Sequence, residues 1–305
     1  MQALKKMSKT NPYFKDYADF LSERFEGKVQ KITVNAGFTC PNRDGKVGWG
    51  GCIYCNNNSF SPTTGTAHRP VSQQIADGKR FFSKKYPEMR YLAYFQSYTN
   101  SYGETDRLMA LYEEALADHD VVGLIIGTRP DCMPDSLLSR LSDLNKSKTV
   151  IIEYGAESSH DSTLAAINRC HDWAATVDAV MRTHSAGLAV GLHFILGLPG
   201  ESIEMMMETV DRASELPIDC IKFHQLQIVK GTRLATDYLN GKLQLKLFDV
   251  DEYIILCSEI VSRIRKDIAI ERFVSQSPDD LLIAPRWGLK NYEFTHRLFN
   301  ALSIK

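Results

Sequence analysis

Short apolar runs alternate with longer amphipathic stretches through most of this 305-residue chain. The runs are rich in β-branched and aromatic residues, a composition that favours strands. They occupy residues 31–35, 92–95, 121–126, 150–154, 188–196 and 220–226. The stretches between them have apolar residues three and four positions apart, which predicts helices, most clearly over 106–118, 135–144, 174–185 and 203–215. Because parallel neighbours need a crossover connection, six such strands predict a parallel sheet, either an incomplete barrel or a doubly wound sheet.

The alternation of strands and helices is absent from both ends of the chain and from one long internal loop. Residues 1–29 are expected to form a helical or irregular N-terminal extension, and residues 30–235 the core. Within the core, residues 36–75 form a long loop, of the kind that is usually functional in compact domains. Residues 236–305 are expected to form a C-terminal extension packed on the core. Its elements are a helix over 251–266, a short apolar run over 269–274 and a final helix over 292–302.

Composition narrows the class of protein. Lys and Arg number 36 against 37 Asp and Glu, so the net charge of -1 does not indicate a nucleic-acid-binding protein, although a local basic patch is compatible with it. Residues 79–85 mix basic and aromatic side chains, which we interpret as the solvated face of a helix. No apolar run approaches the roughly 18 residues of a membrane-spanning helix, and no secretory signal is evident. Seven cysteines, three of them crowded into 16 positions, favour a reducing, cytoplasmic location.

Three cysteines form the most distinctive motif. Cys40, Cys52 and Cys55 lie in the segment GFTCPNRDGKVGWGGCIYC, where a C-x2-C pair lets two sulfurs reach one metal centre and the glycines let the backbone bring Cys40 to them. Structural zinc sites normally have four protein ligands, and the next candidate ligand, His68, is thirteen residues further on. Three thiolates with one open coordination position fit an iron–sulfur cluster better. Incidental buried cysteines are the remaining alternative.

With this loop, and with Tyr54 before its last cysteine, the chain resembles the radical S-adenosylmethionine (SAM) enzymes. It is similar to the branch that contains the elongator catalytic subunit and oxygen-independent coproporphyrinogen oxidase, and more specifically to a bacterial group with CPNRDG-x-GGC loops. The first cysteine gap is eight residues longer than the common C-x3-C-x2-C spacing, which agrees with the elongator-like branch. The resemblance implies an α/β fold, a partial (β/α)6 TIM-like barrel with N- and C-terminal helical extensions.

The same resemblance implies the cofactors and the chemistry. The three cysteines would bind a [4Fe-4S] cluster whose fourth iron is chelated by SAM. An external electron donor of flavodoxin or ferredoxin type would reduce the cluster. Reductive cleavage of SAM would then give a 5′-deoxyadenosyl radical that abstracts hydrogen from a substrate, with the protein positioning the reactants.

Downstream segments carry the resemblance through most of the chain and suggest SAM contacts. In GTRPDC, Gly127 stands where the family often has a glutamate for the SAM amino group, so polar residues ending the second strand become the candidates: Gln96, Ser97, Thr99 and Asn100. In EYGAES, Glu157 matches the position that contacts the ribose hydroxyls. Arg169 matches the arginine that binds the SAM carboxylate, a task suited to a planar guanidinium. In HFILGLPGES, Gly197 shapes a loop beside the adenosyl group, and His193 replaces an aspartate that some relatives have there.

Several alternatives stay open at this point. Each downstream residue taken alone also fits an ordinary role, such as a surface ion pair or a strand-to-helix turn. Cys132 and Cys170 are candidates for an auxiliary cluster, whereas Cys220 and Cys257 fit apolar core patterns. The whole protein could instead be a zinc-stabilised binding or adaptor protein on a barrel scaffold, or a radical SAM scaffold that keeps its cluster for electron transfer. No motif assigns a catalytic residue or a substrate.

Overall fold

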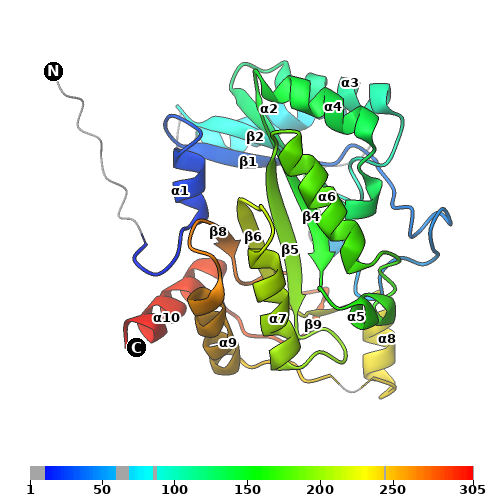
Figure 1. The fold of residues 1–305 in the computed structure, drawn as a ribbon, viewed down its shortest axis with the longest axis vertical. Coiled ribbons are helices and arrows are strands. Elements are labelled where there is room, and N and C mark those ends of the chain that lie inside the picture. The colour runs from blue at the N-terminus through cyan, green and yellow to red at the C-terminus, as the bar shows by residue number, and fades with distance from the viewer. Residues whose placement is uncertain (1–10, 60–68, 85–87, 244, 305) are drawn as a thin grey trace.

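A seven-stranded parallel sheet forms the centre of the fold (Figure 1). A computed structural model describes residues 11–59, 69–84, 88–243 and 245–304. The strands are β1 (Val29–Val34), β2 (Arg90–Phe95), β3 (Val121–Thr128), β4 (Thr149–Glu157), β5 (Ala189–Leu196), β6 (Cys220–Gln225) and β8 (Ala269–Arg272), in that order across the sheet. The six predicted strands are confirmed, and the sheet curls into the expected partial barrel.

The seventh strand comes from the C-terminal extension. β8 lies in the short apolar run 269–274, which the sequence does not identify as a strand because four residues are too few to show a period. It pairs in parallel with β6, where Ile221 lies opposite Ile270. A separate antiparallel pair joins β7 (Ile228–Val229) to β9 (Leu282–Ala284). The C-terminal extension therefore contributes one edge of the barrel.

Helices cover the outer face of the sheet (Figure 1). The longer ones are α2 (Val71–Ser83), α3 (Thr105–Leu116), α4 (Asp135–Asn145), α6 (Trp173–Ser185), α7 (Ile203–Ser214), α9 (Val250–Arg263) and α10 (Asn291–Ser303). Asp172, Ser202 and Asp249 cap α6, α7 and α9, because each side chain accepts a hydrogen bond from a backbone N–H in the first turn. The apolar faces of the helices share one large buried cluster with the outer side of the strands. α2 begins inside the stretch 36–75 that the sequence predicts as a loop.

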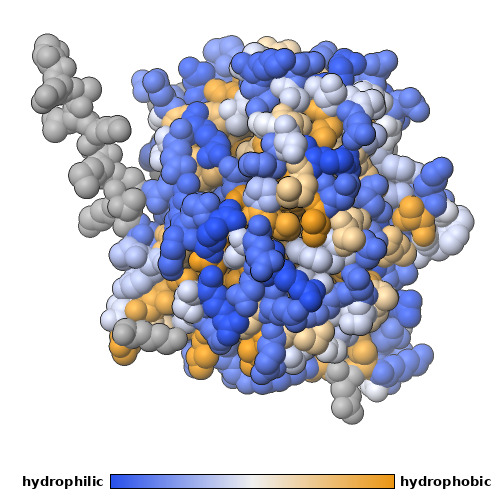
Figure 2. All heavy atoms as spheres, viewed as in Figure 1, coloured by the Kyte–Doolittle hydropathy of each residue, from blue (hydrophilic) through white to orange (hydrophobic). Residues whose placement is uncertain are grey.

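Short elements follow the strands at their C-terminal ends. They are α5 (Asp161–Ala166), α8 (Arg233–Leu239) and the 3-10 turns η1 (Asn57–Ser59) and η2 (Pro130–Cys132). On the face seen in Figure 2, hydrophilic residues cover most of the surface and hydrophobic ones gather in small areas. Within the described ranges, no helix has both the length and the apolar character needed to cross a membrane.

The inner face of the barrel is closed near the N-terminal ends of the strands. α1 (Tyr17–Ser22), in the N-terminal extension, inserts Phe20 among Leu92, Ile125 and Ile151, and all four side chains are fully buried. Two residues further along the strands, a layer of charged side chains faces the same interior. Its members are Lys31, Glu153, Lys222 and Glu271. The interior therefore opens toward the C-terminal ends of the strands, where barrel enzymes carry their active sites.

Candidate active site

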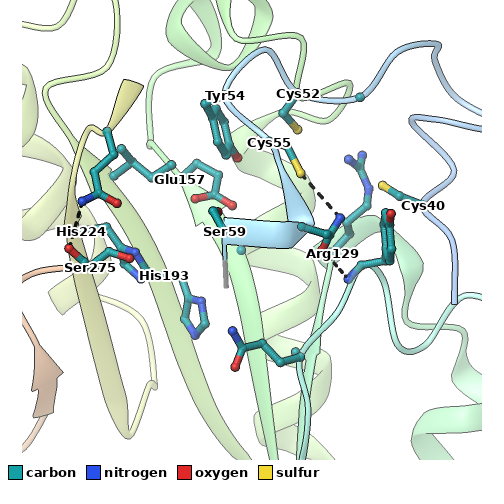
Figure 3. Close-up of a pocket in the computed structure, with 18 of the residues that line it drawn as sticks. Cys40, Cys52, Tyr54, Cys55, Ser59, Arg129, Glu157, His193, His224 and Ser275 are labelled. Atoms are coloured by element: carbon teal, nitrogen blue, oxygen red, sulfur yellow. Dashed lines mark hydrogen bonds between the residues drawn. The ribbon is translucent and has the colours of Figure 1, made fainter. Parts of the chain in front are cut away.

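A cavity of about 230 Å³ lies at the C-terminal ends of the strands. The cysteine loop forms one wall, and His224 and Ser275 lie on the opposite side (Figure 3). Eight of the ten predicted site residues line this cavity: Cys40, Cys52, Tyr54, Cys55, Gln96, Glu157, Arg169 and His193. The fold therefore brings together side chains that are up to 153 residues apart in the chain, counting from Cys40 to His193.

The two other predicted residues lie outside the cavity. Ser97 follows Gln96 after the end of β2 and is buried, with 1% of its surface exposed. Gly197 lies in the turn after β5 in a left-handed conformation, with φ +88°. Its N–H donates to Met206 Sδ at 3.2 Å, and a Cβ added there would lie 3.1 Å from the ring of Phe248. Both residues lie just after the ends of strands whose other residues line the cavity.

The residues after β2, which are the candidates for replacing the family glutamate, lie beside Gly127. Gln96, Thr99 and Gly127 line the cavity. Asn100 is fully buried, and its Nδ2 donates to the Gly127 carbonyl at 2.7 Å. Its Oδ1 has no hydrogen-bond partner in the part of the chain that the structure describes. Of the four candidates, Gln96 and Thr99 are therefore the ones that can contact a ligand in the cavity.

Hydrogen bonds hold the cysteine loop in place. The backbone N–H of Cys55 donates to the Cys52 carbonyl at 3.0 Å, which closes the C-x2-C turn. Asn42 is fully buried, and its Nδ2 donates to the Asn168 carbonyl at 2.6 Å. In return, Asn168 Nδ2 donates to the Gly51 carbonyl at 2.8 Å. These bonds join the loop to the turn after α5.

The spacing of the three cysteine sulfurs distinguishes a cluster from a single metal ion. In a tetrahedral site, zinc–thiolate bonds of about 2.3 Å require ligand sulfurs within about 4 Å of one another. Among the described residues, the sulfurs of Cys40, Cys52 and Cys55 do not all lie within 4.8 Å of one another. An iron–sulfur cluster separates its thiolates further, because each binds a different iron. This spacing fits a cluster better than zinc, and the zinc candidate His68 lies outside the described residues.

Burial and a neighbouring sulfur oppose the ionisation of Cys55. Burial and the neighbouring Cys52 raise the pKa of the Cys55 thiol to about 11. Arg43 acts in the opposite direction on this thiol, and its Nη2 donates to the Cys55 carbonyl at 3.0 Å. Arg169 Nη1 donates to Cys52 Sγ at 3.5 Å. Because metals bind thiolates, these two arginines favour the ionised form that a cluster needs.

Glu157 and Arg169 form a buried ion pair beside the cysteines. Oε1 and Nη2 are 3.6 Å apart, and only 13% and 8% of the two side chains are exposed. A Cβ at Gly155 would lie 2.6 Å from this oxygen and 2.8 Å from this nitrogen, so the pair requires glycine there. Burial raises the pKa of the Glu157 carboxyl, against the attraction of Arg169. Among the described residues Arg169 Nε has no hydrogen-bond partner, so the guanidinium keeps a donor for a ligand.

The backbone around this ion pair is strained. Glu157, Asn168 and Cys170 have left-handed conformations, with φ of 70°, 56° and 59°. In addition, β4 shifts its register against β5 between Gly155 and Glu157. Non-glycine residues in this region and register shifts of this kind concentrate at functional sites, where they redirect side chains.

His193 and Tyr54 are neutral members of the cavity wall. Burial and Lys222 lower the pKa of His193 to about 4, and its Nε2 is 3.0 Å from Glu153 Oε2. Burial and the neighbouring Cys52 raise the pKa of Tyr54 well above its ordinary value. Both side chains therefore offer hydrogen bonds without adding charge to the cavity.

The sequence analysis missed several charged or titratable residues of the cavity. Arg43, Arg129, His224 and Arg272 also line it. Arg129 is 2% exposed and donates two hydrogen bonds to Asp131, at 2.9 and 2.8 Å. Arg129 lies just past the end of β3 and directly before η2, where strand alternation no longer applies, so no periodic signal marked it. Arg272 had no such signal either, because β8 itself is not evident in the sequence.

The remaining cysteines lie outside the cavity. Cys220 and Cys257 are buried, as the apolar patterns predict. Cys132 and Cys170 do not line the cavity either, although each lies close enough to the cysteine loop to interact electrostatically with one of its cysteines. Cys170 Sγ lies 3.2 Å from Asn42 Oδ1, and burial raises the pKa of Cys132 to about 12. All seven cysteines are free thiols.

Comparison with protein families settles the class of protein. Residues 37–213 match the family model of the radical SAM superfamily. The chain belongs to this superfamily. Residues 218–303 match the Radical_SAM C-terminal domain, which includes β8. The resemblance drawn from the cysteine loop is thus confirmed, and the protein is a radical SAM enzyme whose cofactors are a [4Fe-4S] cluster and SAM.

Sequence similarity to individual proteins extends over most of the chain. Protein YtqA of Bacillus subtilis (strain 168) is 36% identical over 273 residues, which are 90% of this chain and 84% of YtqA. Protein YhcC of Escherichia coli (strain K12) is 36% identical over 268 residues, 88% of this chain and 85% of YhcC. Among solved structures, Elp3 of Methanocaldococcus infernus has a TM-score of 0.68 at 17% identity, covering 92% of this chain and 64% of that chain. This last likeness concerns the fold and agrees with the partial barrel.

Proposed function

We propose that the chain binds its [4Fe-4S] cluster through Cys40, Cys52 and Cys55. The observation that carries this assignment is the sulfur spacing, which is too wide for a single zinc ion bound by all three. The two arginines beside these sulfurs stabilise thiolates, and three thiolates leave one iron of the cluster without a protein ligand. When both cofactors are bound, reductive cleavage of SAM supplies a 5′-deoxyadenosyl radical that abstracts hydrogen from the substrate.

We further infer that SAM lies between the cysteine loop and the ends of β4 and β5. Arg169 binds the SAM carboxylate, using the Nε that has no partner among the described residues. Glu157 accepts from the ribose hydroxyls, because its strained backbone turns the carboxylate into the cavity. Tyr54 and His193 complete the contacts with the adenosyl part as neutral hydrogen-bonding groups.

The SAM amino group requires acceptors that Gly127 does not supply. We assign this role to Gln96, which lines the cavity at the end of the neighbouring strand. Ser97 and Gly197 support the site from outside the cavity, where one holds the end of β2 and the other the turn after β5. The protein's own contribution is therefore to orient SAM and to keep water from the reacting atoms.

An external electron donor of flavodoxin or ferredoxin type completes the proposal, because reductive cleavage of SAM consumes an electron that the cluster must receive. We also infer a cytoplasmic location, because none of the seven cysteines forms a disulfide, as in proteins of reducing compartments.

The test is anaerobic reconstitution with iron and sulfide, followed by reduction with dithionite in the presence of SAM and quantification of 5′-deoxyadenosine. We expect iron binding and 5′-deoxyadenosine formation in the wild type, and loss of both in the double variant Cys52→Ala/Cys55→Ala. Cys257→Ala is the matched control, because it removes a buried thiol from α9, away from the cavity. It should retain both properties.

Two results would contradict the proposal. Stoichiometric zinc with almost no iron would favour the zinc-stabilised adaptor protein. An intact cluster without 5′-deoxyadenosine would favour a scaffold that uses its cluster for electron transfer.

A further inference from the structure

A β-bulge in β8 turns two successive charged side chains toward the barrel interior. Ile221 of β6 lies opposite Ile270, but the next residue, Lys222, lies opposite Arg272. Glu271 is thus the extra residue of the bulge, and bulges redirect side chains in this way. Glu271 contacts Lys222 inside the barrel, while Arg272 lines the cavity above it.

The charged layer beneath the cavity is balanced within itself. Lys222 lies 2.5 Å from Glu153 and 3.3 Å from Glu271. Lys31 lies 2.6 Å from Glu271 and 3.4 Å from Glu153. Two cations therefore face two anions, and no more than 17% of any of these side chains is exposed. Glu271 is engaged by the lysines and is not the counter-ion of Arg272.

Arg272 has no carboxylate partner among the described residues. Its Nη2 donates a hydrogen bond to His224 Nε2 at 3.0 Å. Burial and Arg272 itself hold the pKa of His224 well below its ordinary value, so this histidine is neutral. The Nε of Arg272 is buried without a hydrogen-bond partner among the described residues. Arg272 attracts the neighbouring Glu271 and helps to lower the pKa of that carboxyl, but it forms no direct ion pair among the described residues. Its guanidinium therefore faces the cavity from this wall without a direct counter-ion, which a buried guanidinium tolerates only at a cost.

This charge lies in a part of the cavity separate from the cysteine loop. Figure 3 shows His224 and Ser275 on the opposite side of the cavity from Cys40 and Cys55. The wall beside Arg272 is rigid, because Gln225 exchanges hydrogen bonds with the backbone of Ser275 at 2.8 and 2.9 Å. The site thus combines a fixed wall, a neutral histidine and a guanidinium that has donors to offer.

We propose that Arg272 and His224 bind the substrate through an oxyanion group, a carboxylate or a phosphate. This inference rests on the proposed function, because it assigns the end of the cavity away from the cluster to the substrate. An oxyanion there would neutralise the guanidinium and accept from its Nε. It would also fix the substrate at one end, so that a particular C–H bond faces the SAM end of the cavity.

Calorimetric titration of the reconstituted protein with SAM present tests this inference. The probes are inorganic phosphate and acetate, at a constant ionic strength set with sodium chloride. We expect one anion site per chain and at least about tenfold weaker binding in Arg272→Gln, since hydrogen bonds to charged groups have this magnitude. Arg107→Gln is the matched control, because Arg107 is exposed on α3, outside the cavity. It should bind the anion as the wild type does.

The outcomes distinguish a phosphate from a carboxylate, and they distinguish failure of the anion site from failure of the proposed function. Binding of phosphate alone assigns a phosphorylated substrate, and binding of acetate assigns a carboxylate. Should Arg272→Gln fail to fold, Arg272→Lys keeps the charge without the planar fork and should still bind measurably weaker. Unchanged affinity in the Arg272 variants, or no binding to the wild type, would overturn the inference. Because calorimetry does not depend on SAM cleavage, a protein that binds the anion through Arg272 without forming 5′-deoxyadenosine contradicts the proposed function alone.

Discussion

Replacing Lys222 by methionine should destabilise the fold severely. Lys222 Nζ lies 2.5 Å from Glu153 Oε2, and 3% and 0% of the two side chains are exposed. Lys222→Met keeps the length of the side chain but removes its charge. Among the described residues, Lys31 is then the one charged ion-pair partner left for Glu153 and Glu271, so that two buried carboxylates share a single lysine. Breaking a buried pair on one side costs about 3–5 kcal/mol, so we expect a loss of this size in the free energy of unfolding.

Urea unfolding of the apoprotein at pH 7, followed by circular dichroism, measures this loss. The double variant Glu153→Gln/Lys222→Met restores the charge balance, so it should regain at least about 2 kcal/mol relative to Lys222→Met. A double variant as unstable as the single one would refute the reasoning, because the loss would then reflect packing and not an uncompensated charge.

The ion pairs of Glu153 also determine how the stability of the fold responds to acid. Burial opposes the ionisation of Glu153, but Lys222 and Lys31 outweigh it and hold its pKa well below the ordinary value, so this stabilisation is present at neutral pH and is lost in strong acid.

Three further perturbations test other parts of the site. Gly155→Ala should displace the ion pair of Glu157 and Arg169 and weaken SAM binding about tenfold or more in equilibrium dialysis. Asn42→Ala should lower the iron content after reconstitution and cost about 1–2 kcal/mol in unfolding experiments, because Asn42 fastens the cysteine loop. Burial and Lys222 lower the pKa of His193 to about 4, so the unfolded chain binds a proton at this residue at higher pH than the folded protein does. The free energy of unfolding should therefore fall by up to about 3 kcal/mol as the pH falls from 6.5 to 4. His193→Gln should abolish that part of the pH dependence. Normal SAM affinity, normal iron content or an unchanged pH profile would contradict the respective prediction.

The parts of the fold that could be predicted are those with a local signal. Six strands and the main helices each carry a period in their own residues, and the cysteine loop carries a spacing. The charged layer had no such signal, because Lys31 and Glu271 meet across 240 residues of chain. β8 is too short to show a period, and its bulge depends on pairing with β6. Interactions that exist only after the barrel has closed are thus absent from any window of the sequence.

The bulge in β8 also explains why two adjacent residues of opposite charge do not simply neutralise each other. In a regular strand, Glu271 and Arg272 would point to opposite faces of the sheet, and one of the two would enter the apolar layer under the helices. With the extra residue, both face the interior, where the two lysines bind Glu271 and Arg272 reaches the cavity. The charged layer therefore does more than close the barrel. Its two lysines engage the carboxylate of Glu271, so that Arg272 has no ion-pair partner among the described residues and its guanidinium is available for a ligand.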